Sequence, residues 1–215
     1  MTVFIRAVLA GLLIGFGGCA FLASPIPFAG AFMFATGLLS ICVTGQYLYT
    51  GKICFANSGK AFLQLPFILV FNLLTAYGFG WAVHFMKAPF AKKAFEMCST
   101  KLGEGLMVIP LGICCNILIY FAVKCQQDKN SIGLIMCVMT FILCGFEHCI
   151  ANAFYFGAGG IYGLPVLTYM GLNVLGNTIG GLLCLGCEAY LVHIEKKEFT
   201  DAMDRAFSRW MGRAL

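Results

Sequence analysis

Charged residues are scarce in this sequence. Asp, Glu, Lys and Arg make up 11% of its 215 residues, whereas about a quarter of an average soluble domain is charged. Hydrophobic residues reach 60%. This balance excludes an ordinary soluble domain, and with it a nucleic-acid-binding module, which needs a basic face on a soluble surface. The composition therefore predicts a membrane protein.

Histidine is also rare, and the sequence contains only His84, His148 and His193. A membrane redox protein that binds haem would need pairs of histidines on facing spans, so this class is disfavoured. No Asn-Pro-Ala triplet occurs, which disfavours a water or glycerol channel. Cysteine is plentiful at twelve residues, but most lie in apolar segments, where a free cysteine behaves as a small hydrophobe. We expect no disulfide framework, no metal site and no cofactor.

Six apolar segments are long enough to cross a hydrocarbon core of about 30 Å. The first begins at Met1 and has no convincing cleavage site, so we expect a retained span rather than a signal peptide. Its glycines predict close packing between helices. The segments cover approximately residues 2–23, 27–49, 62–86, 105–124, 131–151 and 172–193.

Basic residues predict the orientation of these spans. With the N-terminus inside, ten Lys and Arg residues fall on the cytoplasmic side and four on the outer side, and such a bias marks the cytoplasmic side. We therefore expect a multi-pass protein of the plasma membrane with both termini in the cytoplasm. The pattern of apolar and charged residues over 194–215 predicts a cytoplasmic amphipathic tail that lies along the inner membrane face. Its apolar positions recur at helical spacing at Phe199, Met203, Phe207 and Trp210.

Two segments look unsuited to straight helices. Residues 45–52 interrupt the second span and contain Thr50, and the glycine-rich residues 154–163 predict a second interruption after Asn152. Backbone that leaves a helix at membrane depth must be buried in protein or line a watery cavity. Glu147 and His148 lie just before Asn152. Because an ionisable group inside a membrane-length segment is costly, these two side chains mark a pathway for ions, protons or substrate.

Weak internal similarity predicts a repeat. Residues 1–100 and 101–193 each contain three spans, so the halves would insert in opposite senses and their broken helices would meet near the midplane. We expect a single all-α transmembrane domain over residues 1–193, built as an aquaporin-like inverted repeat of 3+3 helices. The matching pairs are Asn72 with Asn177, Gly11 with Asn116, and Phe34 with Phe141.

Three motifs resemble the formate/nitrite transporter family, which includes hydrosulfide channels. They are Gly145-Phe-Glu-His-Cys-Ile-Ala-Asn152, Leu48-Tyr-Thr-Gly51 and Gly176-Asn-Thr-Ile-Gly-Gly181. The resemblance spans nearly all of residues 1–193. It implies a six-helix protomer, a homopentamer with one pore in each protomer, and a channel for small monovalent anions rather than an enzyme. The partners it implies are the anion, a proton and membrane lipid.

The resemblance also implies a set of pore residues. His148 matches the family's central histidine with Glu147 behind it, Thr50 matches a loop threonine, and Asn177 matches an amide near the last helix. Lys101 would attract anions to an outer vestibule. The apolar slits would be formed by Phe34, Phe141, Leu38, Leu48 and Ile119, and two further amides, Asn116 and Asn152, complete the set.

A bare anion is costly to desolvate in an apolar slit, whereas its conjugate acid crosses more easily. Histidine is the side chain whose charge changes most readily near neutral pH, so we expect a proton to be shared at His148. Alternatively, His148 only donates a hydrogen bond and the proton comes from bulk water. Phe141, seven residues earlier, is expected on the same helix face. Formate or nitrite is the expected substrate, with hydrosulfide as the alternative within the family.

Overall fold

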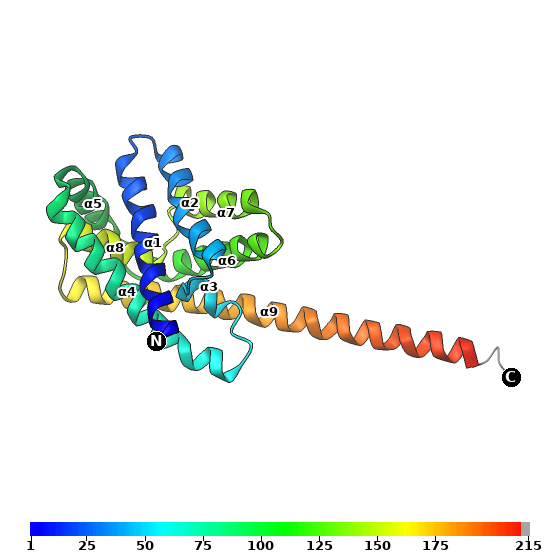
Figure 1. Ribbon diagram of the computed structural model, residues 1–215. Helices are drawn as coiled ribbons and strands as arrows, with labels where there is room; N and C mark the ends of the chain where they lie inside the picture. Colours follow the sequence, from blue (N-terminus) through cyan, green and yellow to red (C-terminus); the bar gives the residue numbers. More distant parts are fainter. Residues whose placement is uncertain (212–215) are drawn as a thin grey trace.

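The computed structural model describes residues 1–211, without the side chains of 201, 202 and 204–211. This part of the chain consists of helices and contains no strand, which confirms the all-α class. The helices are α1 Thr2–Ala23, α2 Pro27–Thr44, α3 Tyr49–Ile53, α4 Gly59–Met86, α5 Ala88–Lys101, the 3₁₀ helix η1 Leu102–Met107, α6 Val108–Gln127, α7 Ser131–Leu143, α8 Cys149–Gly159 and α9 Leu164–Met211 (Figure 1).

Five stretches of helix are long and apolar enough to cross a membrane: 2–23, 27–44, 59–86, 88–127 and 164–200. The expected fifth span is not one helix. It consists of α7, with 13 residues, and α8, with 11, each too short to cross about 30 Å alone. The count of six spans and the opposite insertion of the two halves stay predictions.

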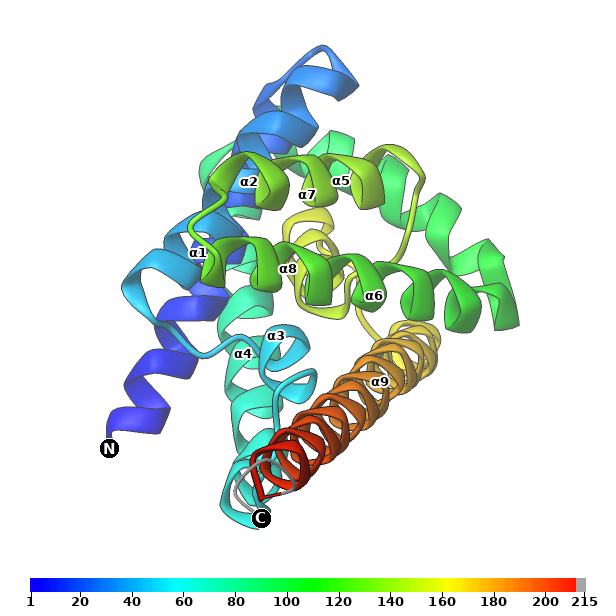
Figure 2. The same cartoon turned by 90° about the vertical axis from the view of Figure 1, so that its right-hand side faces the viewer.

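Helix α8 lies at the centre of the bundle (Figure 2), and all eleven of its residues are buried. Glycines on α8 and on its neighbours let the helices approach closely enough for α8 to lie there. A Cβ on Gly80 of α4 would lie 2.1 Å from the carbonyl oxygen of Phe154, and one on Gly157 would lie 2.2 Å from that of Tyr77. In α1, a Cβ on Gly18 would lie 2.4 Å from the ring of Phe154. The expected close packing through small residues is confirmed.

The second interruption lies earlier in the chain than the sequence predicted. Residues 144–148 leave the helix, and α8 then runs without a break to Gly159. The expected interruption after Asn152 is therefore wrong. A Cβ on Gly159 would lie 3.1 Å from the backbone of Phe95, so this glycine provides room for α5. The chain leaves α8 only at Gly160, whose φ of +67° is a left-handed conformation that favours glycine.

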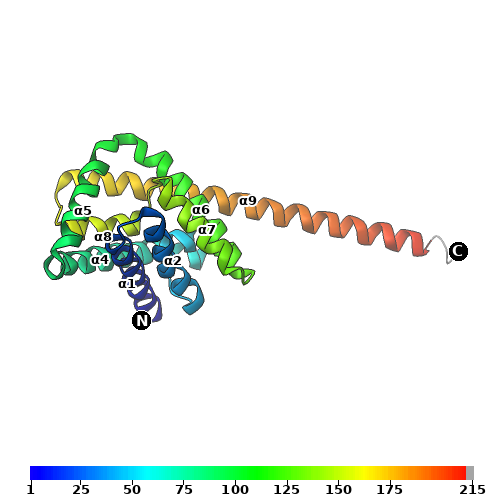
Figure 3. The same cartoon turned by 90° about the horizontal axis from the view of Figure 1, so that it is seen from above.

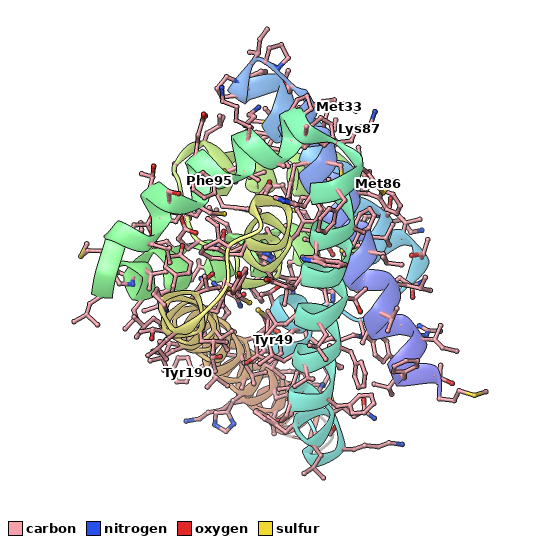
Figure 4. The ribbon with its side chains drawn as sticks, turned by 90° about the vertical axis from the view of Figure 1, so that its left-hand side faces the viewer. Met33, Tyr49, Met86, Lys87, Phe95 and Tyr190 are labelled. Carbon is pink, nitrogen blue, oxygen red and sulfur yellow. The ribbon has the colours of Figure 1, made fainter. Side chains whose placement is uncertain are left out.

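Between α4 and α6 the chain forms α5 and η1. Helix α5 packs against α8 and is tied to the end of α1 by Lys93, whose ammonium donates to the carbonyl oxygens of Phe21, Leu22 and Ser24 at 3.3, 3.2 and 2.6 Å. The C-terminal end of the α1 dipole is negative, so it attracts the Lys93 ammonium. Figure 4 shows Met86, Lys87 and Phe95 at this edge of the bundle, and their side chains are exposed.

Helix α9 extends well beyond the bundle (Figures 1 and 3). The boundary expected at residues 193 and 194 falls inside this continuous helix. The contact of the tail with the inner membrane face stays a prediction. The side chains of Phe207 and Trp210 and the whole of residues 212–215 lie outside the described part of the chain.

Candidate functional site

The two interruptions are built alike. Gly45 ends α2 with φ of +68°, and Gly145 follows α7 with φ of +69°. The residue after each glycine donates its backbone N–H to the carbonyl oxygen five residues before it at 2.9 Å, from Gln46 to Ile41 and from Phe146 to Phe141. The two turns therefore end their helices with the same backbone conformation and the same hydrogen bonding.

Asn177 of α9 holds the second interruption in place. Its side-chain amide donates to the carbonyl oxygens of Gly112 and Glu147, both at 2.8 Å. Its oxygen accepts the backbone N–H of Cys149 at 2.8 Å. Asn177 thereby pairs two backbone groups at the break, the Glu147 carbonyl and the Cys149 N–H, and links them to Gly112 of α6. This pairing matters because unpaired polar groups are costly when buried.

Asn72 of α4 does the same for the first interruption. Its amide donates to the carbonyl oxygens of Ala7 at 2.7 Å and Tyr47 at 3.0 Å, and its oxygen accepts the N–H of Tyr49 at 2.8 Å. Tyr49 lies inside the bundle in Figure 4, and its hydroxyl is 2.8 Å from that of Thr178 on α9.

These contacts relate the two interrupted regions to each other. The two asparagines are 105 residues apart, as the sequence predicted, whereas the interruptions are offset by 100. The alignment of Phe34 with Phe141 is wrong, because Ile41 is the residue that occupies the place of Phe141 before the first glycine. In this alignment Leu48 occupies the place of His148, and both immediately precede a short helix.

His148 is the N-cap of α8, and its ring is fully engaged. Nδ1 accepts the backbone N–H of Ala151 at 3.1 Å, and Nε2 lies 3.0 Å from Oγ1 of Thr50. A neutral imidazole has one acceptor and one donor nitrogen. Since Nδ1 accepts, Nε2 carries the proton and donates it to the Thr50 oxygen. The hydroxyl hydrogen of Thr50 is then left for another acceptor.

Two phenylalanines lie beside this pair. The rings of Phe141 and His148 are stacked, with centroids 5.9 Å apart and an interplanar angle of 22°. Phe34 meets Phe141 edge-on at 6.1 Å. Phe141 and His148 were expected on one helix face, but this is wrong because α7 ends at Leu143. Residues 144–148 leave the helix, and the path of this segment brings the two rings together.

Two cavities approach the Thr50–His148 pair. The smaller, of about 80 Å³, is lined by Phe34, Lys101, Phe141, His148 and Asn152 among others. The larger, of about 240 Å³, is lined by Leu38, Leu48, Gly51 and Lys52 among others. The cavities share no lining residue. Thr50 lies between Leu48 and Gly51 in the chain and bonds to His148, so the pair stands between the two cavities.

Glu147 is buried beside the smaller cavity. One carboxylate oxygen forms an ion pair with Lys101. The other accepts from the Asn152 amide at 2.6 Å and from the Tyr169 hydroxyl at 2.7 Å. Its backbone oxygen also accepts from Asn173 at 2.7 Å. Lys101 thus lines the cavity with its charge offset by a carboxylate, rather than as a free cation.

The other predicted residues lie behind the cavity walls. Asn116 donates from its amide to the carbonyl oxygen of Thr50 at 3.1 Å and so orients this residue. Ile119 is buried and does not line either cavity. The predicted set is therefore brought to one place, with seven members lining the cavities: Phe34, Leu38, Leu48, Lys101, Phe141, His148 and Asn152.

Sequence reasoning missed Tyr169 and did not assign Asn173 to the site. The expected sixth span began at residue 172, whereas α9 begins at Leu164. A usable signal was present, since Tyr169, Asn173 and Asn177 are four residues apart and therefore share one helix face. All three side chains contact Glu147, through its carboxylate or its carbonyl oxygen.

The sequence profile described as "Formate/nitrite transporter" matches residues 1–191. The chain belongs to this family. The members it resembles include a probable formate transporter of Methanothermobacter thermautotrophicus, which is 23% identical in an alignment that covers 90% of this chain and 89% of the relative. The formate channel BtFdhC of Bacillus thuringiensis is 25% identical over 193 residues, covering 78% of this chain and 73% of the relative.

A solved pentameric formate channel with formate bound has the same fold. It superposes with a TM-score of 0.73 at 21% identity, covering 90% of this chain and 97% of that one. A structure described as an ion channel of the same family also has a TM-score of 0.73, at 19% identity. Membership of the family makes this chain a membrane transport protein for small anions, whose relatives are channels and transporters rather than enzymes.

Proposed function

We propose that this chain forms a pore for the small monovalent anions of weak acids, formate or nitrite, in each protomer of a homopentamer. The pore lies in the plasma membrane, and both termini are cytoplasmic. The observation that carries the proposal is the buried hydrogen bond between Thr50 and His148, which stands between two separate cavities. The names of the relatives support formate as the substrate.

The substrate accepts a hydrogen bond at this pair. With Nε2–H of His148 donated to Thr50, the threonine hydroxyl donates its own hydrogen to a substrate oxygen. The apolar rings of Phe34 and Phe141 narrow the adjoining cavity. An anion loses its hydration there at high cost, and sharing a proton lowers that cost. The substrate therefore crosses the apolar part of the pore as its conjugate acid.

The hydrogen bond from Ala151 limits what His148 can do. A proton on Nδ1 would break this bond, and losing an N-cap costs about 1 kcal/mol. Charging the imidazole in a buried site adds a desolvation cost. The resting histidine is therefore neutral, and it shares a proton only while the proton that accompanies the anion passes the pair.

Substitutions of His148 test the proposal. In proteoliposomes, His148→Phe abolishes formate flux because no polar donor remains at the pair. His148→Asn keeps an N-cap for α8 and a hydrogen-bond donor but cannot titrate, so formate passes with a flattened pH dependence. His193→Asn is the matched control, since His193 is exposed. Native mass measurement verifies that each variant assembles as the wild type does.

The outcomes separate the alternatives. Wild-type pH dependence in His148→Asn means that the histidine only donates a hydrogen bond and that bulk water supplies the proton. Wild-type flux and pH dependence in both variants contradict the central role of His148. Flux assays with formate, nitrite and hydrosulfide at equal concentration identify the substrate, and faster hydrosulfide flux would replace formate by the alternative of the same family.

A further inference from the structure

The hydroxyl of Tyr169 lies between two carboxylates. It is 2.7 Å from Oε2 of Glu147 and 3.4 Å from Oε2 of Glu104. A phenol has one hydrogen to donate, and the shorter distance assigns it to Glu147. The phenol oxygen can then accept a hydrogen from Glu104 when that carboxyl group is protonated. The three groups form a chain of hydrogen bonds with one direction, from Glu104 towards Glu147.

The surroundings favour a protonated Glu104. Lys101 forms an ion pair with Glu147, so one cation faces two carboxylates. Glu104 is half-buried, and the phenol oxygen that it faces already donates its hydrogen to the Glu147 carboxylate. A proton on Glu104 removes the repulsion between the two carboxylates and supplies the hydrogen that the phenol oxygen can accept. Other polar or titratable groups face the cluster from four helices: Cys98 of α5, Cys115 of α6, Asn152 and Tyr155 of α8, and Asn173 and Asn177 of α9.

Tyr169 also lines a second opening, which is separate from the smaller cavity. A crevice of about 360 Å³ lies between η1 and the start of α9, and its lining includes Leu102, Gly105, Thr168 and Tyr169. It shares no residue with the cavity that contains His148. Glu104 itself lies on η1 and is half-buried. Water can therefore approach the Glu104–Tyr169 end of the chain without entering the path of the anion.

We propose that Glu104 and Tyr169 form a side entrance for protons, which reach the pore through Glu147 and Lys101. This inference rests on the proposed function, because it requires a proton to be shared with the substrate. Glu104 and Tyr169 are relay residues, and the residue that meets the anion is Lys101, which lines the same cavity as His148.

Each transfer conserves protons. Lys101 gives a proton to the anion, which becomes its conjugate acid, and is left as a neutral amine. Tyr169 gives its hydroxyl proton to Oε2 of Glu147 while its oxygen takes the proton of Glu104, so the phenol stays neutral. The protonated Glu147 carboxyl turns about its Cγ–Cδ bond and returns the proton to the Lys101 nitrogen. Glu104 is reprotonated by hydronium or a buffer acid from the outer solution.

The test compares Glu104→Gln with Glu96→Gln in proteoliposomes that report formate uptake and internal pH together. Glutamine can still hydrogen-bond Tyr169 but cannot carry the proton. Near an outer pH of about 7.5, Glu104→Gln should lower proton-coupled uptake about ten-fold. A positioned proton donor typically raises an enzymatic rate a hundred-fold or more. We expect a smaller loss of uptake here because water also reaches the site by other routes. Glu96, an exposed carboxylate of α5, is the matched control and should leave uptake unchanged.

The pH profile separates a relay from structural damage. Near an outer pH of about 5.5 the solution itself supplies protons, so Glu104→Gln should recover wild-type uptake. Tyr169→Phe, which removes the hydroxyl alone, should show the same profile. An equal loss at every pH, or a wild-type profile in Glu104→Gln, overturns the relay while leaving the proposed function intact. If wild-type uptake carries no protons at all, the proton sharing of the proposed function fails, and the relay fails with it.

Discussion

His148 illustrates how single side chains are held at this site. Its imidazole begins α8, stacks on Phe141 and bonds to Thr50, so one ring has structural and chemical roles together. The asparagines behind the interruptions have a purely structural task. Asn72 and Asn177 each hydrogen-bond two backbone groups at an interruption and one carbonyl oxygen of a neighbouring helix.

Asn177→Leu should therefore destabilise the protein strongly. It leaves the backbone N–H of Cys149 without its partner in a buried site, at about 1–3 kcal/mol, and it also removes the hydrogen bonds to the carbonyl oxygens of Gly112 and Glu147. Thermal unfolding in detergent should shift to a clearly lower temperature, and Asn72→Leu should cause a similar shift because its contacts are equivalent. Asn57→Leu is the control, since Asn57 is exposed. Unchanged melting of Asn177→Leu would contradict the structural role of this amide.

At the scale of elements, α8 is the helix on which the site depends. It starts at His148, it is buried along its whole length, and its backbone touches that of α4. Two glycines of α4 differ sharply in what surrounds them. A Cβ on Gly80 would meet the backbone of α8 at 2.1 Å, whereas one on Gly78 would meet no atom within 4 Å.

Gly80→Ala should push α8 away from α4 and displace His148 from Thr50. We expect reduced thermal stability, by about 1–3 kcal/mol as for other overpacked sites, together with a large loss of formate flux. Gly78→Ala is a matched control on the same helix. It should be neutral or stabilising by up to about 1 kcal/mol, because alanine is the better helix former. Equal behaviour of the two variants in melting and flux would show that the α4–α8 contact is not close-packed.

At the scale of the whole molecule, many large apolar side chains face outward. On α4 they include Leu63, Trp81 and Phe85, which are 83%, 54% and 69% exposed. Such a surface needs lipid or neighbouring protomers to cover it. Both cavities of the site lie within a single chain, so each protomer in an assembly would have its own pore.

We expect a detergent-stable homopentamer. The solved formate channel with the same fold is pentameric, and small residues along the spans permit tight packing between helices. Native mass spectrometry should give five copies of the 23.3 kDa chain. A monomer or dimer under conditions that preserve flux would contradict this expectation.

Several features of the protein are properties of composition and local pattern. Low charge and long apolar segments establish a membrane protein, because transfer into lipid depends on the residues themselves and on their number. The Glu147–His148 pair stands out for the same reason, since ionisable groups are costly in such a segment. The correspondence of Asn72 with Asn177 is likewise visible as a repeat in the sequence.

Only the tertiary structure decided where the second helix breaks and what surrounds His148. Glycine has two uses, conformational freedom and close approach, and its neighbours determine which applies. Gly157 and Gly159 look like breakers in the sequence, yet they are helical and packed against α4 and α5. The contacts of Tyr169 with Glu104 and Glu147 join three distant parts of the chain. Their register depends on how whole helices pack, and no local pattern contains that information.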